Sequence, residues 1–79
     1  MEKIKEIEVK DIWLASYLKT KGYEMVGIKR DGNFAIFIFM MDEVKYEEEI
    51  KLYMTDKGFV SAKAYKENFI MLKHKIYSK

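Results

Sequence analysis

Phe34-Ala35-Ile36-Phe37-Ile38-Phe39-Met40-Met41 is an unbroken apolar run, and it follows the turn-forming pair Asp31-Gly32. Successive side chains of a strand point to opposite faces of a sheet, so a strand of this composition needs cover on both faces. A chain of 79 residues has little material for two layers of cover. The run therefore predicts architecture and assembly rather than chemistry.

The residues on both sides of this run predict a β-hairpin. Asp-Gly between two hydrophobic stretches favours a two-residue type I′ turn, because both central residues of such a turn need positive φ. Strands over 23–30 and 33–41 would then pair with Arg30 opposite Asn33 and Val26 opposite Phe37.

Both faces of the predicted hairpin are mostly apolar. One face carries Val26, Ile28, Phe37 and Phe39. The other face carries Tyr23, Met25, Ile36, Ile38 and Met40. Gly27, inside the first strand, marks a bulge or a close approach by a helix.

Three helices are predicted around the hairpin, over 12–21, 43–55 and 62–77. Asp11 is a good N-cap for the first helix and Ser61 for the third, and Gly22 stands where a left-handed C′ residue is expected. The first helix is apolar around most of its circumference, so we expect it to contact two other elements.

In the second helix the inner stripe is Tyr46, Ile50, Tyr53 and Met54, and Glu47, Glu48 and Glu49 mostly form its solvated side. In the third helix the inner stripe is Tyr65, Phe69, Leu72 and Ile76.

The predicted organisation is a charged N-terminal segment over 1–10 followed by one α+β domain over 11–79. The domain reads helix, β-hairpin, helix, helix. We expect the N-terminal segment to be a tail that ends in a short extended piece at 7–9, which is the place for an extra strand. An isolated hairpin is marginal in water, so it must be stabilised by the helices or by a second sheet.

Composition favours a folded protein of the cytoplasm. Hydrophobic residues make up 49% of the chain and there is no cysteine, so packing alone must stabilise it in a reducing setting. The N-terminus lacks a hydrophobic signal core, and no stretch is apolar enough to span a membrane. The net charge of +2 does not indicate a general polyanion binder.

The inventory of catalytic groups is thin, and we predict that the protein is not an enzyme. His74 is the single histidine, and we interpret it as a solvated helix residue. The carboxylates around Glu43 and Glu47 are interpreted as a solvated acidic face rather than a cation site. No phosphate loop, EF-hand or dinucleotide fingerprint is present, so no cofactor, metal or catalytic residue is predicted.

Charge is unevenly distributed along the chain. Residues 42–56 hold six acids and two lysines, a net of −4, and residues 61–79 hold five lysines and one glutamate, a net of +4. The two segments either pair with each other inside one fold, or meet across a subunit contact, or leave a basic face for nucleic acid. That candidate face consists of Lys63, Lys66, Lys73, His74 and Lys75, with Lys79 and the hairpin-tip residues Lys29 and Arg30 as additions. A single arginine in the chain argues for weak, unspecific contact with phosphates.

Aromatic residues are the remaining candidates for a site. Trp13, Tyr17, Tyr23, Phe34 and Tyr53 are able to line a ligand pocket, although in so small a domain we interpret them first as core or interface. No particular small ligand is indicated.

Short motifs carry a resemblance over residues 11–77. They are Asp11-Ile12-Trp13-Leu14-Ala15-Ser16-Tyr17-Leu18, Lys21-Gly22-Tyr23, Phe37-Ile38-Phe39, Tyr53, Gly58-Phe59-Val60, Leu72-Lys73 and Ile76-Tyr77-Ser78. With these the chain resembles a family of short, uncharacterised bacterial and phage proteins classed as a domain of unknown function. It departs from the family at Met40-Met41, where polar or acidic residues are typical. The resemblance implies a link to mobile elements but no activity, cofactor or catalytic residue.

The doubly apolar strand and the broadly apolar first helix lead to our main hypothesis, a non-enzymatic interaction module that self-associates as a homodimer. The candidate contact residues are Trp13, Tyr17, Phe34, Ile36, Ile38 and Met40. The alternatives are a nucleic-acid-binding accessory protein that uses the lysine face, and a phage-type protein that sequesters a small ligand or blocks a host protein. No membrane partner is expected.

Overall fold

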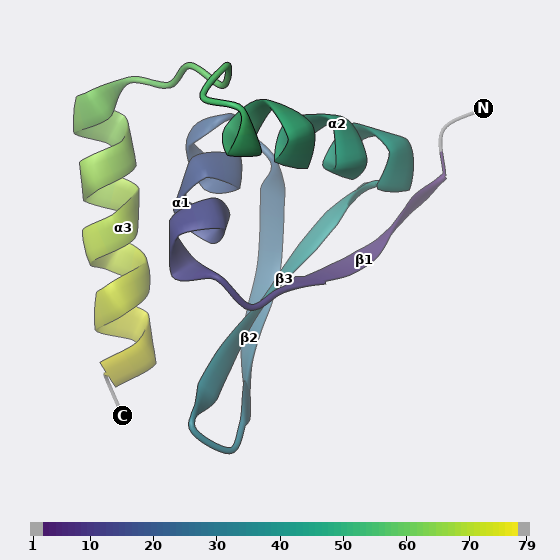
Figure 1. Cartoon of the computed structure of the whole chain (residues 1–79). Helices are drawn as coiled ribbons and strands as arrows, with labels where there is room; N and C mark the ends of the chain where they lie inside the picture. Colours follow the sequence, from purple (N-terminus) through teal and green to yellow (C-terminus); the bar gives the residue numbers. More distant parts are fainter. Residues whose placement is uncertain (1–2, 78–79) are drawn as a thin grey trace.

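An antiparallel sheet with its longest strand in the centre organises residues 3–77, the part of the chain that this computed structural model describes (Figure 1). The elements follow in the order β1 (Ile4–Val9), α1 (Ile12–Thr20), β2 (Glu24–Asp31), β3 (Phe34–Asp42), α2 (Glu43–Met54) and α3 (Ala62–Tyr77). Within these residues the sheet has the strand order β1-β3-β2. The predicted α+β class and the order helix, hairpin, helix, helix are confirmed.

β1 is longer than predicted and is a full member of the sheet. It pairs with β3 over its whole length, from Ile4 opposite Asp42 to Val9 opposite Phe37. Ile7 and Val9 alternate with charged residues, so the apolar side chains reach the core while the charged ones stay in water. The N-terminal segment is therefore not a tail, because most of it forms an edge strand of the domain.

The hairpin turn lies one residue later than predicted. Asp31 pairs with Phe34, and the loop consists of Gly32 and Asn33. Gly32 has a φ of +62°, and a glycine with positive φ at the first central position is the pattern of a type II′ turn. The predicted pairing is therefore wrong by two positions: Ile28 lies opposite Phe37 instead of Ala35.

The irregularity predicted at Gly27 is present as a break in the ladder between Met25 and Gly27. The extra residue, Val26, has no partner on β3 and is exposed. Beyond the break the alternation is reversed, so Met25 lies opposite Phe39 and packs against the core. The predicted faces of Val26, Met25 and Tyr23 are thus corrected: Met25 and Tyr23 contact the core, and Val26 does not.

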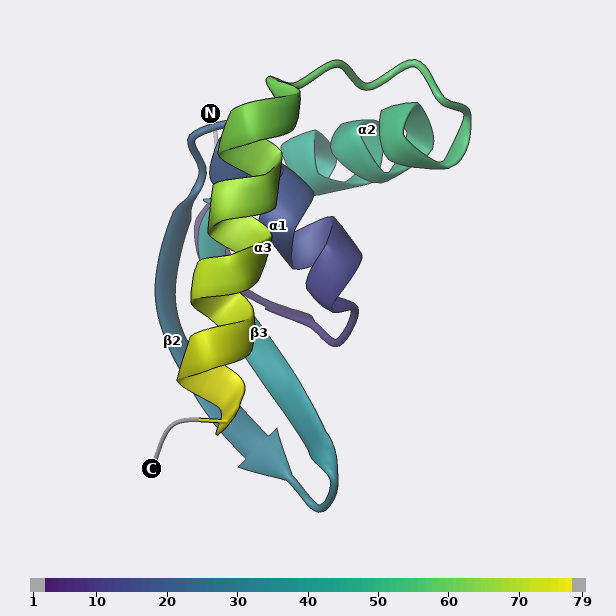
Figure 2. The same ribbon diagram turned by 90° about the vertical axis from the view of Figure 1, so that its left-hand side faces the viewer.

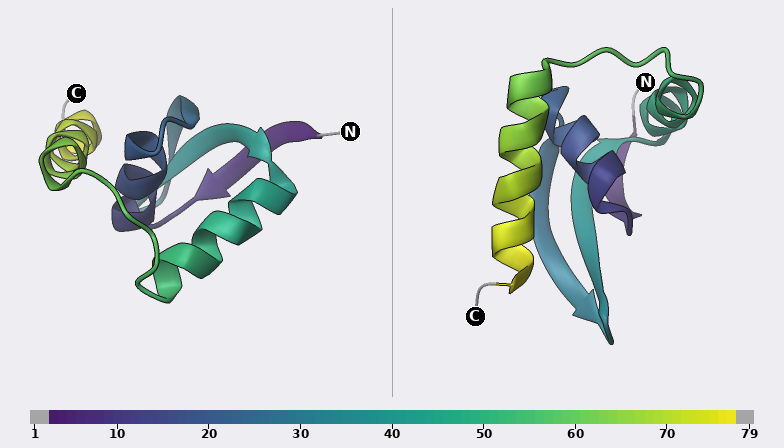
Figure 3. Two further views of the ribbon diagram at one scale, coloured as in Figure 1. Left: turned by 90° about the horizontal axis from the view of Figure 1, so that it is seen from above. Right: turned by 60° about the vertical axis from the view of Figure 1, so that its left-hand side comes forward.

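All three helices lie on one side of the sheet, as the view from above shows (Figure 3). The core between them consists of Ile7, Val9, Phe37, Phe39 and Met41 from the strands, Leu14, Ala15, Tyr17 and Leu18 from α1, and Leu72 from α3. α3 runs beside α1, seen in front of it in Figure 2, so α1 is packed between the sheet and α3. This position accounts for the broad apolar surface of α1, which was expected to contact two elements.

The helix ends follow the predicted caps. Asp11 Oδ1 accepts a hydrogen bond from the N–H of Trp13 at 2.9 Å, and Ser61 Oγ accepts one from the N–H of Ala64 at 3.3 Å. Gly22 has a φ of +100° after the end of α1. One prediction for α2 is wrong: Met54, assigned to its inner stripe, is 75% exposed, because the helix ends there and the chain turns away from the core.

Candidate functional site

The face of the sheet that is turned away from the helices is an apolar surface left without a covering helix among residues 3–77. We call it the open sheet face. Its centre is a row of alternate β3 residues, and two more apolar residues lie at its margins. Its apolar members are Ile4, Val26, Phe34, Ile36, Ile38 and Met40.

Exposure along this row is uneven. Phe34, at the hairpin end, is 68% exposed, whereas Ile36 is 3% exposed although it is not part of the core under the helices. Glu8 of β1 and Lys29 of β2 form an ion pair with 2.6 Å between Glu8 Oε2 and Lys29 Nζ. The register places them on either side of β3, opposite Ile38 and Ile36, so the pair crosses the central strand above this row.

The charges on the open sheet face differ from one end to the other. Met40 is flanked by Glu6 and Glu24, its partners on the two outer strands. At the hairpin end Lys29 is joined by Lys10. The charge of Lys29, and to a smaller extent that of Lys10, lowers the pKa of the Glu8 carboxyl. The face is thus acidic at the Met40 end of β3, whereas toward the hairpin Lys29 and Lys10 are accompanied by Glu8 and by Asp31, which lies opposite Phe34.

Two of the six residues predicted for self-association do not belong to this face. Tyr17 is 2% exposed and packs in the core of its own chain, so that prediction is corrected. Trp13 lies on α1, where its ring stacks on Phe69 of α3 with 4.2 Å between centroids. Trp13 is nevertheless 50% exposed, so packing within the chain accounts for most of the apolar surface of α1 but not for all of it. Phe34, Ile36, Ile38 and Met40 remain together on the open sheet face.

A buried carboxylate that sequence reasoning placed in solvent connects three elements. Glu49 of α2 is 7% exposed. Its Oε1 accepts a hydrogen bond from the Tyr17 hydroxyl at 2.8 Å, and its Oε2 accepts one from the Tyr23 hydroxyl at 2.7 Å. Lys21 Nζ lies 4.0 Å from Glu49 Oε2. The burial of Glu49 could have been predicted from its spacing. It is three residues from Tyr46 and four from Tyr53, so it shares their helix face.

This network has the chemistry of a structural tether. Burial, together with the hydrogen bond to Glu49, raises the pKa of both Tyr17 and Tyr23 to about 12. Both hydroxyls therefore stay protonated at neutral pH, where they act as donors and not as bases or nucleophiles.

The lysine face of α3 is exposed, and its charges are not paired with α2. Among residues 3–77 the ion pairs are Lys5–Glu43, Lys21–Glu49, Lys29–Glu8 and Lys45–Glu48. None of them involves α3, so the alternative in which the two charged segments pair inside the fold receives no support in this part of the chain.

The helical positions of the lysine face divide it into two groups. One side of α3 carries Lys63, Lys66, Lys73 and His74, together with Ile70 and Tyr77. A common hollow on this side is bordered by Ile70, Lys73, His74 and Tyr77. Ile70 lies between Lys66 and Lys73. Lys75 is nine residues from Lys66 and points to the other side of the helix. Lys79 lies outside the described residues.

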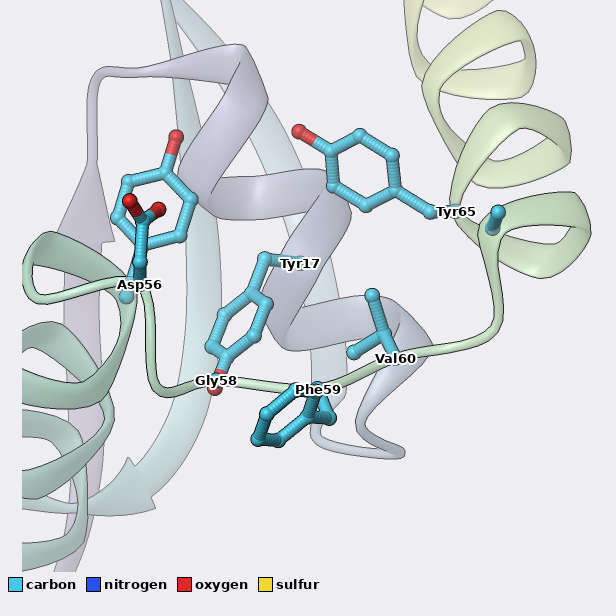
Figure 4. Close-up of a pocket in the computed structure, with 8 residues that line it drawn as sticks. Tyr17, Asp56, Gly58, Phe59, Val60 and Tyr65 are labelled. Atoms are coloured by element: carbon cyan, nitrogen blue, oxygen red, sulfur yellow. The ribbon is translucent and has the colours of Figure 1, made fainter.

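A cavity of about 340 Å³ opens where the connection between α2 and α3 passes over α1 (Figure 4). Of the five aromatic residues predicted as pocket candidates, it brings together Tyr17 and Tyr53, and it adds Tyr65 and Phe59. Trp13, Tyr23 and Phe34 do not line it. The other lining residues are Asp56, Gly58, Val60 and Ala62.

Metal-binding groups and membrane-spanning helices are both absent among the described residues. From residue 3 to residue 77 there is no group of three or more histidine, aspartate and glutamate side chains arranged to hold a metal ion. None of the helices in that range is long and apolar enough to cross a membrane.

Comparison with known proteins gives one match. The model of a family described as "Domain of unknown function (DUF5659)" matches residues 4–78, from the first residue of β1 onward. The predicted resemblance to an uncharacterised domain family is thereby confirmed. No curated protein and no solved structure matches the chain.

Proposed function

The chain belongs to the DUF5659 family, a domain of unknown function, and we propose that it is a non-enzymatic interaction module that forms a homodimer through the open sheet face. The observation that carries the proposal is the exposed Phe34 together with the partly buried Ile38 and Met40, which no helix of residues 3–77 covers; Ile36, in the same row, is already buried. Burying roughly 400 Å² of apolar surface per chain would contribute on the order of 10 kcal/mol before the costs of association.

A second copy is the partner that the charges of this face fit. In a two-fold arrangement with the β3 strands antiparallel, the acidic end of one face meets the half of the other face that carries Lys10 and Lys29. Glu6 and Glu24 of one chain then lie near Lys10 and Lys29 of the second chain. The apolar row remains between the charged ends, as in the dry centre and polar rim of a protein interface.

Pairing of sheet edges is the less favourable route to a dimer. The outer edge of β2 is interrupted by the bulge at Val26, and β1 alternates charged with apolar residues. Bulges and charged side chains are common means by which edge strands avoid pairing. The face of the sheet, rather than its edge, therefore supports the proposal.

Light scattering coupled to size exclusion, from about 1 to 500 µM, tests the homodimer, since a modest interface is expected to dissociate in the micromolar range. We expect the mass to rise toward that of two chains. Replacing the exposed Phe34 and Val26 together by threonine should weaken the dimer at least about tenfold, because apolar contact is lost while β-propensity is kept. Val44→Thr, an equally exposed apolar position on α2, is the matched control and should leave the mass unchanged.

The direction of packing is tested by charge. Glu24→Lys places a lysine near Lys29 of the second chain and should weaken the dimer, most strongly at low salt. Glu47→Lys makes the same change on the solvated side of α2 and should have no effect. A monomer at every concentration, or equal weakening by both substitutions, contradicts the arrangement.

The second candidate function is contact with nucleic acid through the lysine face of α3. It is favoured by Lys63, Lys66 and Lys73, which lie on one side of the helix and have no ion-pair partner among residues 3–77. Binding to duplex or single-stranded DNA should be measurable at about 20 mM salt and fall steeply by about 200 mM. Lys66→Glu should abolish it, and Lys75→Glu, on the other side of α3, should reduce it less. Absence of binding at low salt removes this candidate.

A cytoplasmic location and an origin in bacteria or phage belong to this proposal as well. The location rests on the lack of cysteine in the sequence, and the origin rests on the sequence motifs.

A further inference from the structure

The cavity beneath the α2–α3 connection has the walls and the charge of a site for an organic cation. We propose that it binds a quaternary or methylated ammonium group, carried either by a free small molecule or by a methylated lysine side chain. This site is separate from the open sheet face, because its residues come from α1, the end of α2, the α2–α3 connection and α3.

Aromatic rings form the walls of the cavity (Figure 4). The rings of Tyr17 and Tyr53 meet as a corner, with 5.3 Å between centroids and 50° between planes. Tyr65 reaches in from α3, and the exposed Phe59 lies at the mouth. A cation placed over such rings is attracted by the negative potential of their faces, and this attraction is strongest for alkylated ammonium groups, which lose little hydration on entry.

Hydrogen bonds hold two of these rings in place. The Tyr17 hydroxyl donates to Glu49 Oε1 at 2.8 Å, and the Tyr65 hydroxyl donates to the carbonyl oxygen of Trp13 at 3.2 Å. Their polar atoms are therefore already used. The Tyr17 ring is itself buried, and Lys21 Nζ lies 5.9 Å from its centroid, so the ring faces left for a ligand are those of Tyr53, Tyr65 and Phe59.

The charge around the cavity is negative. Asp56 lines it, and no lysine or arginine does. Asp11 lies close enough for its charge to act on two of the walls. Burial and then the Asp11 carboxylate raise the pKa of Tyr53, and burial, then Tyr53 and then Asp11 raise the pKa of Tyr65. The carboxyl end of α2, the negative end of its dipole, immediately precedes Asp56. α3 begins at the opposite side, where Ser61 caps its first turn.

The floor of the cavity is fixed by the backbone. The N–H groups of Lys57 and Gly58 both donate to the carbonyl oxygen of Leu52, at 2.9 and 3.1 Å. Asp56 holds a φ of +60°, which turns the chain across the end of α2. The volume of about 340 Å³ lies at the small end of ligand sites, which suits a compact head group.

Titration of the ¹⁵N-labelled protein with choline and with its uncharged isostere 3,3-dimethylbutan-1-ol tests the proposal. The two probes have the same shape and differ in charge. We expect choline to shift the amide resonances of Gly58 and Val60 and to bind at least about tenfold more tightly than the isostere. Equal affinity of the two probes, absence of shifts at these amides, or tighter binding of acetate overturns the proposal.

A second pair of probes distinguishes the source of the cation. N-acetyl-trimethyllysine methylamide and its unmethylated counterpart present the side chain as a protein would. Tighter binding of the trimethylated form than of choline assigns the site to a methylated lysine side chain. Tighter binding of choline assigns it to a free small molecule.

Substitutions in the walls separate recognition from folding. Tyr53→Leu should weaken choline binding by about fivefold or more, whereas Tyr53→Phe keeps the aromatic face and should bind as the parent does. Asp56→Asn removes the negative charge, so the affinity for choline should fall. Asparagine tolerates the positive φ of this position, so the unfolding midpoint should stay unchanged. Unchanged affinity in both Tyr53→Leu and Asp56→Asn contradicts the proposed site.

Discussion

Glu49→Ala should lower the free energy of unfolding by about 2–4 kcal/mol, because it leaves two tyrosine hydroxyls without their acceptor at a largely buried site. The hydroxyls are those of Tyr17 and Tyr23, and their hydrogen bonds join α1 and the start of β2 to α2. Urea unfolding followed by the fluorescence of Trp13 measures the loss. An effect of this size would be a large part of the total stability expected for a domain of this length.

The neighbouring glutamate is the control for this result. Glu48→Ala removes a carboxylate one residue away on the exposed side of α2 and should change the free energy by less than about 0.5 kcal/mol. Glu49→Gln keeps one acceptor oxygen and should fall between the two. Equal losses in Glu48→Ala and Glu49→Ala would show that the network does not stabilise the fold.

Alkaline pH gives a second measurement on the same variant. Tyr17 and Tyr23 have a pKa of about 12 when folded, raised first by burial and then by Glu49, against an ordinary value of 10.0. A group whose pKa is higher in the folded state stabilises the fold fully below its unfolded pKa, and this contribution is lost as the pH rises through the folded value. Between pH 10 and 12 the stability of the parent should therefore fall more steeply than that of Glu49→Ala.

Gly58→Ala should cost about 1–3 kcal/mol, because the added methyl group overlaps a side chain that is held in place by a hydrogen bond. A Cβ at position 58 would lie 2.8 Å from Cζ and 2.9 Å from Cε1 of Tyr17. That ring is buried and its hydroxyl is bonded to Glu49, so relief requires a shift of the backbone. For a domain of this size the loss corresponds to a decrease in Tm of roughly 4–24 °C.

Gly27 provides the matched control, since a Cβ there would meet nothing within 4 Å. Gly27→Ala should leave the Tm within about 2 °C of the parent. Because the clash involves Tyr17, the double variant Gly58→Ala with Tyr17→Phe should lose less than the sum of the two single variants. Additive losses, or an unchanged Tm in Gly58→Ala, would argue that the connection does not press on Tyr17.

Local signals predicted the elements of this fold well. Asp11, Gly22 and Ser61 mark helix boundaries through backbone geometry and hydrogen bonds that involve only near neighbours. The hairpin was also predicted, but its register was not, because Asp31-Gly32 and Gly32-Asn33 are both plausible two-residue turns. In the structure Asp31 pairs with Phe34, so the turn is Gly32-Asn33. The turn preferences of these residues do not by themselves predict that pairing.

The candidate sites depended on contacts between distant parts of the chain, and these were harder to predict. Composition identified the row from Phe34 to Met40 as a strand with too little cover, and one side of it is open. It did not show that Tyr17 would be buried against α2, since the partner, Glu49, is 32 residues away. Only Tyr17 and Tyr53 of the cavity were among the predicted pocket residues, because Asp56 and Tyr65 meet Tyr17 only after α2 and α3 have packed.

The central place of β3 has a consequence for the order in which the chain can fold. β2 and β3 are joined by a two-residue loop and can pair within microseconds, whereas β1 must wait for a strand that is separated from its own end by 24 residues. During synthesis β1 and α1 leave the ribosome before their partner strand exists. A hairpin that forms early is apolar on both sides, so we expect the chain to be most prone to aggregation at this stage. When β1 pairs with β3, Glu6 and Glu8 lie beside the apolar strand and make aggregation less favourable.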